Sequence, residues 1–321
     1  MNELKGIHHV TAITHDVKKN YHFMTQILGM RLVKKTVNQD DIYTYHTFYA
    51  DDMGNPGTDL TFFDFPQILQ GTHGTNSISR IGLRVPNDAA LEYYRDRFDQ
   101  YGVKHEGIFE LYGSKILKFE EEDGQRYQLF SDEHDHGVPA GTPWKQGPVP
   151  EEFAIYGLGP IEITVSYFDD FKMLLQEIYG MTIHIEEDDV TVFEVGQGGH
   201  GGQVILRRDT TSPVSRQGYG EIHHVSFRVE DHEAIQAWLN KYMERNIRNS
   251  GLVDRFFFEA LYARIGHILV EISTDGPGFM GDEPYETLGE KLSLPPFLEK
   301  DREYIERQVK PFNSVWTGKK D

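Results

Sequence analysis

The stretch Ile7-His8-His9-Val10 stands near the start of the chain, and Ile222-His223-His224-Val225 repeats it near the other end. A hydroxyl residue follows each copy, Thr11 in the first and Ser226 in the second. Apolar and polar residues then alternate, and a segment with helical spacing comes next. The repeat predicts two similar structural modules, each opening with a strand that carries two adjacent histidines.

Two further segments between these copies follow the same plan, so we expect four modules. Each has a strand, then a helix, then two or three more strands. The four modules span residues 6–66, 76–132, 157–208 and 220–275. In the first, Asp16 is a plausible helix cap, and the spacing predicts a helix over 17–28 that ends at Gly29.

Alignment of the four opening strands predicts how the modules pair. The position of His9 is Arg80 in the second module, Glu162 in the third and His224 in the fourth. If one metal ion binds both histidines, the first and fourth modules must lie side by side. The second and third must then pair with each other, although chain order alone would have paired the first with the second.

The chain divides into halves at 133–152, where glycine and proline are concentrated. We expect a first domain over 1–140 and a second over 153–275, with the metal site shared by the first and fourth modules. The tail, 276–321, contains an amphipathic stretch, Glu299–Val309, which should pack as a helix on the outside. The predicted fold class is α+β.

Composition excludes several classes of function. The 321 residues include no Cys, so disulfides, cysteine–zinc sites and thiol catalysis are excluded. A formal net charge of −19 argues against nucleic-acid partners and anionic membranes. No run of about 18 apolar residues and no apolar signal region occurs. We therefore predict a cytoplasmic protein.

A carboxylate completes the candidate metal site. Ile268-Leu269-Val270-Glu271-Ile272 is an apolar strand with a glutamate inside it. Two histidines and one carboxylate form the ligand set of non-haem Fe(II) sites that keep open coordination positions. Strand residues alternate between faces, so one histidine of each pair should bind, but the alternation leaves open which one.

A short hairpin places a tyrosine opposite this glutamate. Gly266-His267 fits a two-residue turn, and counting outward from it pairs Tyr262 with Glu271 on one face. A phenol there can bind substrate or donate a proton. Arg255 lies at an odd offset from Tyr262 and should face the other side unless a bulge intervenes.

These motifs resemble the vicinal-oxygen-chelate superfamily, which includes glyoxalases, bleomycin resistance proteins and extradiol dioxygenases. Within it, the chain looks like the hydroquinone-type ring-cleaving dioxygenases over nearly its whole length. The motifs that carry the resemblance are Ile7-His8-His9-Val10-Thr11, Ile222-His223-His224-Val225, Tyr262-x-Arg264, Leu269-Val270-Glu271-Ile272, Thr274-Asp275-Gly276-Pro277-Gly278-Phe279 and Leu294-Pro295-Pro296. The resemblance implies βαβββ modules that build two half-open mixed β-barrels, followed by a helical tail.

The resemblance also implies a site and a reaction. His9, His224 and Glu271 would bind Fe(II), with Mn(II) as the alternative metal. The residues around metal and substrate would be Tyr262, Arg255, His8, Thr11 and His223. The implied reaction opens the ring of a hydroquinone-like or catechol-like aromatic with O2 as cosubstrate, in aromatic catabolism or detoxification. The expected partners are a small aromatic substrate and O2. The sequence leaves open whether the chain forms a homo-oligomer.

Two motifs that look functional are rejected as sites. Asp132-Glu133-His134-Asp135-His136 resembles a metal site but is interpreted as a solvated charge run. Gly196-Gln197-Gly198-Gly199-His200-Gly201-Gly202 opens no helix, as a phosphate-binding loop would, and is interpreted as a flexible hairpin tip near the active site.

Plainer interpretations stand beside each functional one. Tyr262 could be a core aromatic, Arg255 a surface ion-pair residue, and His8 and His223 structural histidines. The alternative functions are a metal-dependent isomerase or lyase of the glyoxalase type, which resembles a site with four protein ligands, and a metal-free aromatic-binding resistance protein, which lacks the histidine pairs.

Overall fold

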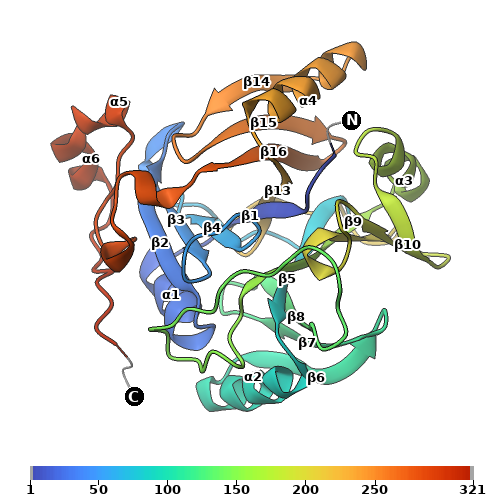
Figure 1. Cartoon of the computed structure of the whole chain (residues 1–321), viewed down its shortest axis with the longest axis horizontal. Helices are drawn as coiled ribbons and strands as arrows, with labels where there is room; N and C mark the ends of the chain where they lie inside the picture. Colours follow the sequence, from blue (N-terminus) through green and yellow to red (C-terminus); the bar gives the residue numbers. More distant parts are fainter. Residues whose placement is uncertain (1–2, 319–321) are drawn as a thin grey trace.

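The computed structural model describes residues 3–318, and its strands form two eight-stranded mixed sheets (Figure 1). The first sheet has the order β14-β15-β16-β13-β1-β4-β3-β2 and consists of β1 (Ile7–Ile13), β2 (Arg31–Asn38), β3 (Asp41–Ala50), β4 (Asp59–Phe63), β13 (Ile222–Val229), β14 (Asn249–Asp254), β15 (Phe258–Ile265) and β16 (Ile268–Pro277). The second has the order β10-β11-β12-β9-β5-β8-β7-β6 and consists of β5 (Ser77–Val85), β6 (Lys104–Leu111), β7 (Ser114–Glu120), β8 (Arg126–Ser131), β9 (Gly157–Val165), β10 (Thr182–Glu186), β11 (Val190–Glu194) and β12 (Gln203–Arg208).

The two sheets confirm the predicted pairing of modules. The first joins the first and fourth modules through an antiparallel contact of β1 with β13. The second joins the second and third modules through β5 and β9. Each sheet therefore takes one module from each half of the chain, and the α+β class is confirmed. The domain boundaries expected from the sequence stay a prediction.

The helices lie against the sheets, and three of them begin at polar caps. They are α1 (Val17–His22), a π-helix (Phe23–Ile27), α2 (Asp88–Tyr101), α3 (Phe168–Glu177) and α4 (His232–Glu244), with short 3-10 turns at His200–Gly202, Phe279–Gly281 and Tyr285–Thr287. The side chains of Asp16, Asn87 and Asp231 accept hydrogen bonds from backbone N–H groups in the first turns of α1, α2 and α4.

The first predicted helix differs from the structure in one detail. It is α-helical only as far as His22 and continues as a π-helix, because the Leu28 N–H bonds the carbonyl of Phe23, five residues earlier. Gly29 then ends it with a φ of 75°. A Cβ at Gly29 would lie 2.6 Å from the side chain of Val149, so the close packing of the linker also requires glycine here.

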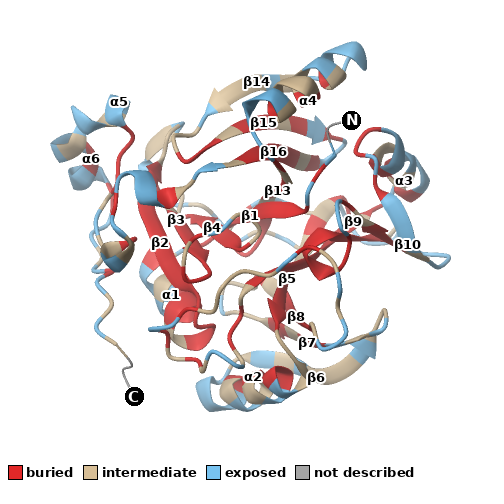
Figure 2. Ribbon diagram, viewed as in Figure 1, coloured by how far each residue is buried: buried red, intermediate tan, exposed pale blue. Residues whose placement is uncertain are grey.

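The core lies along the strands at the centre of both sheets (Figure 2). Every residue of β1 is buried, including its histidines and Thr11, so polar groups on this strand must find partners inside the protein. The helices and the tail carry most of the exposed residues in this view. Among residues 3–318, the structure contains no helix long and apolar enough to cross a membrane.

The tail packs outside the first sheet, as predicted, but as two short helices. These are α5 (Pro296–Glu299) and α6 (Arg302–Gln308), so the expected single helix over 299–309 is wrong in detail. Ile305 of α6 is buried with Val37 of β2 and Tyr45 of β3. The buried ammonium group of Lys34 also anchors the tail through Asp282, at 2.8 Å, and Glu283.

A half-buried acid near α1 makes stability depend on pH. Burial, followed by the charge of Asp123, raises the pKa of Glu121 to about 8. The fold therefore favours the protonated form, and ionisation costs stability once the pH exceeds the ordinary glutamate pKa of about 4.5. The cost grows up to about pH 8 and then levels off.

We expect Glu121→Gln to remove this pH dependence. The variant should match the wild type at pH 4.5 and be more stable at pH 8.5, by roughly 3 kcal/mol. Melting temperatures at both pH values test this. Glu122→Gln is the matched control, because the neighbouring Glu122 side chain is 79% exposed. Parallel pH profiles for Glu121→Gln and the wild type would contradict the prediction.

Candidate metal centre

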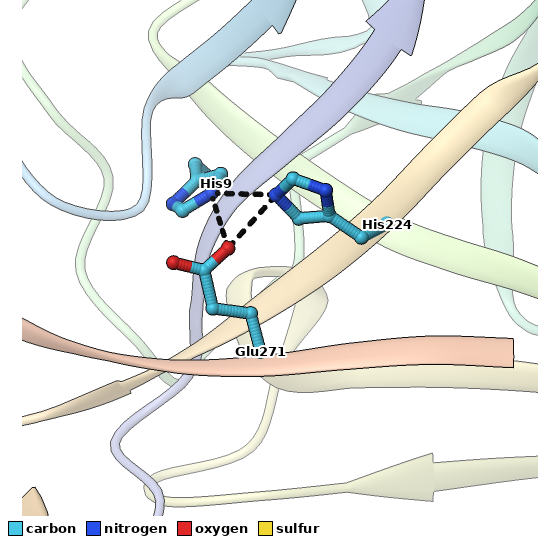
Figure 3. A group of neighbouring side chains, drawn as sticks. All are labelled: His9, His224 and Glu271. Atoms are coloured by element: carbon cyan, nitrogen blue, oxygen red, sulfur yellow. Dashed lines mark hydrogen bonds and ion pairs between the residues drawn. The ribbon is translucent and has the colours of Figure 1, made fainter. Parts of the chain in front are cut away.

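Three donor atoms converge inside the first sheet, on His9, His224 and Glu271 (Figure 3). His9 Nε2 lies 3.2 Å from His224 Nε2 and 3.1 Å from Glu271 Oε2. His224 Nε2 lies 2.8 Å from the same oxygen. The residues are 2%, 4% and 0% exposed. All three side chains therefore point at one buried place.

The strand order explains why these residues meet. In the sheet, β13 lies between β1 and β16, and Ser226 of β13 pairs with both His9 and Glu271. Residues in one row across a sheet share a face, and His224 is two residues before Ser226, so it shares that face too. The question that alternation left open is thus decided by pairing: the second histidine of each pair joins the glutamate.

His8 sets the hydrogen position on His9. Its Nε2 lies 3.1 Å from the carbonyl oxygen of Thr274, which only accepts, so this nitrogen carries the hydrogen. Burial, reinforced by His9, holds the pKa of His8 well below its usual value, and the ring is neutral. Its Nδ1 therefore accepts from His9 Nδ1, at 2.9 Å. His9 Nε2, the other ring nitrogen, faces Glu271 Oε2 at 3.1 Å.

The charges of the group suit a cation. Burial lowers the pKa of His224, against the opposing effect of Glu271, so the imidazole is neutral. Burial alone would raise the pKa of Glu271, but His9 and His224 hold it well below the usual range. Glu271 Oε1 accepts a hydrogen bond from Ser273, whereas Oε2 accepts none within residues 3–318.

Tyr262 and Arg255 lie together beside this group. Tyr262 pairs with Glu271 across β15 and β16, which confirms the hairpin count. Arg255 donates through Nε to the Tyr262 hydroxyl, at 3.2 Å, and through Nη2 to Asp40, at 2.9 Å. Arg255 lies in the turn between β14, which ends at Asp254, and β15, which begins at Phe258, so the odd offset along a strand does not apply to it. Burial, then Glu271, raises the pKa of Tyr262 well above 10, so the phenol keeps its proton.

The remaining predicted residues take two different places. His223 lines a cavity in front of the three donors, with its Nδ1 2.8 Å from His224 Nδ1. Thr11 lies behind them, where its hydroxyl is 2.9 Å from His224 Nε2 and 2.8 Å from the hydroxyl of Thr61. His8 does not line this cavity either.

The cavity has a volume of about 450 Å³ and a largely aromatic wall. His9, His224, Tyr262 and Arg255 reach it from the metal side. Further lining residues escaped the sequence analysis: Asp40, His46, Phe48, Phe63, Ser250, Phe257 and Phe258. They belong to no motif, and only the pairing of the first and fourth modules brings them together.

Comparison with known proteins agrees with this architecture. Residues 6–138 match the glyoxalase/bleomycin resistance protein/dioxygenase superfamily. A Bacillus subtilis (strain 168) protein named as ring-cleaving dioxygenase MhqA is 46% identical over 316 residues, which cover 96% of this chain and 99% of the relative. This chain belongs to the glyoxalase/bleomycin resistance/dioxygenase superfamily.

Other superfamily members extend the comparison. The chlorohydroquinone/hydroquinone 1,2-dioxygenase of Sphingobium indicum is 27% identical to this chain. The match covers 92% of this chain and 93% of that relative. A crystal structure of a Bacillus subtilis protein named as a dioxygenase has a TM-score of 0.88 and 32% identity, with coverage of 97% and 98%. Glyoxalase I from Zea mays has a TM-score of 0.60 at 13% identity, which shows a shared fold alone.

The second sheet of this superfamily member carries different residues at the matching positions. Arg80 and Glu162 replace the two histidines. By strand pairing, Arg207 takes the place of Glu271, since it lies beside Thr164 as Glu271 lies beside Ser226. Glu162 accepts from Arg207 Nε at 2.8 Å. Arginine offers no lone pair to a metal, so these positions form an ion pair instead.

The two rejected motifs come together in the structure, and their interpretation was wrong in part. Asp132, Asp135 and His200 have donor atoms within 4.8 Å of one another. Arg84 donates to both carboxylates, at 2.8 and 3.1 Å, and His200 Nδ1 lies 2.7 Å from Asp132. Asp132 and Asp135 therefore belong to an ion network around Arg84, whereas the other three residues of the charge run, Glu133, His134 and His136, are exposed as expected. In the glycine-rich stretch only Gly196 and Gln197 are exposed, and residues 198–202, including His200, are buried.

Proposed function

We propose that this chain is an Fe(II)-dependent ring-cleaving dioxygenase of the extradiol type, acting on hydroquinone-like or catechol-like aromatics. One observation carries the proposal: two imidazole nitrogens and one carboxylate oxygen converge at an aromatic-walled cavity. The names of the relatives support it, since two of them are a ring-cleaving dioxygenase and a chlorohydroquinone/hydroquinone 1,2-dioxygenase.

The donor group fits a divalent metal. His9 Nε2 and His224 Nε2 both face Glu271 Oε2, at 3.1 and 2.8 Å, so two imidazole nitrogens and a carboxylate oxygen surround one place where a cation would be stabilised. The donor atoms lie 2.8 to 3.2 Å apart. Ligands at right angles with bonds of about 2.1 Å would be roughly 3 Å apart. Two histidines and one carboxylate favour Fe(II), and Mn(II) accepts the same ligands.

A bound Fe(II) would supply adjacent open positions at which a ring oxygen and O2 can meet. The aromatic wall formed by Phe48, Phe63, Phe257 and Phe258 would hold the flat ring and exclude water. The cavity volume of about 450 Å³ lies within the range usual for small ligands.

Tyr262 and Arg255 would handle the charge and the proton. The Tyr262 oxygen accepts from Arg255, so the phenol keeps its own O–H hydrogen, which it can turn from Glu271 to a substrate oxygen. Arg255 adds a positive charge beside the phenol, which stabilises negative charge that develops on the substrate. His223, which directly precedes His224 on β13, would form part of the wall of the same cavity.

The residue at the place where a fourth protein ligand would lie is a threonine, and this argues against a glyoxalase-type isomerase. Thr11 of β1 pairs with Thr61 of β4 in the way that Ser226 pairs with Glu271. Thr61 therefore takes the place that matches Glu271, and its hydroxyl is engaged by Thr11 and His46. Three ligands leave more open positions than four, which favours an oxygenase. The converging donors argue against a metal-free binding protein.

Oxygen uptake tests the proposed function. Protein loaded with Fe(II) under anaerobic conditions should consume O2 and the aromatic in equal amounts with at least one substituted hydroquinone or catechol. Metal-free protein and Zn(II)-loaded protein should consume neither, because the reaction needs a metal that can change its oxidation state. An isomerase would act without O2. Failure of the Fe(II)-loaded protein across the whole substrate set would refute the proposal.

A further inference from the structure

His46 of β3 lies in the wall of the cavity, on the first module, and no motif marks it in the sequence. Its imidazole is held between two aromatic rings, Phe48 at 4.1 Å and Phe63 at 4.4 Å between centroids. The packing restricts the ring to one orientation, as a group that recognises a ligand requires.

One nitrogen of His46 is engaged and the other is not. Nε2 lies 3.0 Å from the hydroxyl of Thr61, whereas Nδ1 has no hydrogen-bond partner among residues 3–318. Nδ1 is also absent from the buried polar atoms that lack a partner, so it is open to the cavity that the residue lines. Burial lowers the pKa of His46, so the ring is neutral and Nδ1 can accept or donate according to the tautomer.

His46 stands close to the metal centre but not in contact with it. Hydroxyl contacts of 3.0, 2.8 and 2.9 Å lead from His46 through Thr61 and Thr11 to His224 Nε2. Thr61 occupies the place that matches Glu271, so His46 lies one side chain beyond the candidate ligands.

Two polar groups of the same wall already have partners, while, among the described residues, Thr36 Oγ1 has none and His223 is engaged only through its Nδ1. Arg255 is bonded to Tyr262 and Asp40, and the Ser250 hydroxyl accepts from the Tyr262 N–H and donates to the Gly251 carbonyl. The rest of the wall is largely aromatic. His46 Nδ1 therefore offers a hydrogen-bonding atom that a substrate can use without displacing an existing bond.

We infer that His46 recognises the second hydroxyl group of a 1,4-diol whose first oxygen lies at the metal centre. A hydroquinone carries its hydroxyl groups at opposite ends of the ring, so one meets the metal and the other meets His46. A catechol carries both at one end and leaves His46 unpaired. His46 thus makes the cavity select 1,4-diols over catechols and simple phenols, and the inference rests on the proposed function.

Binding without oxygen tests this role separately from turnover. Hydroquinone and phenol differ by the hydroxyl in question, so their affinities for Fe(II)-loaded protein are measured anaerobically by calorimetry. The wild type should bind hydroquinone about tenfold more tightly than phenol. In His46→Phe that ratio should fall to about one, while the affinity for phenol stays within about threefold.

His46→Gln is the companion variant, since its amide can hydrogen-bond and should keep part of the preference. His73→Phe is the control, because His73 lies outside the cavity lining and bonds the Gly124 carbonyl instead. A wild type without preference for hydroquinone, or a His46→Phe protein that keeps it, would overturn the inference. A protein that shows the binding ratio yet consumes no O2 would refute only the proposed function.

Discussion

Replacing Glu271 with alanine is expected to abolish metal retention while the fold persists. Glu271 supplies the only negative charge among the three converging donors and is 0% exposed. Changes to groups that merely support a ligand cost 10- to 100-fold in metal affinity. Removal of the donor itself should therefore cost more than about 100-fold. Iron content per chain after anaerobic loading and desalting, with the melting temperature of the metal-free protein, measures both parts.

Glu162→Ala is the matched control for this experiment. Glu162 is also a buried glutamate in a central strand, but it lies in the second sheet and pairs with Arg207. The control should retain iron like the wild type, even if its melting temperature falls because Arg207 loses its partner. A Glu271→Ala protein that kept one iron per chain with unchanged affinity would show that the metal assignment is wrong.

Tyr262→Phe is expected to keep the iron and the fold but to lose turnover. The hydroxyl lies across the strand pair from Glu271, accepts from Arg255 and keeps its proton, since burial followed by Glu271 raises its pKa well above 10. Loss of a proton donor or of a charge-stabilising hydrogen bond typically slows an enzyme by about 10²- to 10⁴-fold. Iron content, melting temperature and oxygen uptake are measured on one preparation.

The alternative, that Tyr262 is a packing residue, gives the opposite result. A core aromatic changed to Phe would alter stability slightly and the rate hardly at all. Tyr179→Phe calibrates the loss of a buried hydroxyl, because the Tyr179 and Tyr242 hydroxyl groups lie 3.0 Å apart, away from the cavity. Full iron together with wild-type oxygen uptake in Tyr262→Phe would assign the residue to packing.

The pairing of modules could be predicted because chemistry appears at one aligned strand position. Histidine at 9 and 224, against Arg80 and Glu162, separates the first and fourth modules from the other two. The register of Tyr262 with Glu271 was predictable for a different reason: a two-residue turn determines every pair that follows it. The first inference rests on ligands shared by one metal ion, and the second on the local geometry of a turn.

Arg255 and the two rejected motifs were harder, because each depends on an irregularity or a distant partner. Strand alternation alone directed Arg255 away from Tyr262, and the sequence did not show that Arg255 lies in the turn before β15, where alternation does not apply. Asp132 and His200 are far apart in the chain, and their contact around Arg84 depends on how the second sheet closes. The sequence contains no signal for that contact.

The sequence by itself determined the four modules, their pairing and the residue types of a three-donor metal site, because strand periodicity and turn length are local properties. Only the tertiary structure decided which histidine of each pair joins Glu271, since Ser226 must pair with both β1 and β16 for one row to form. It alone placed His46 and the phenylalanine wall around the donors. Cavities are made by side chains from strands distant in sequence, and the free energy that assembles them comes from burial, which local patterns do not encode.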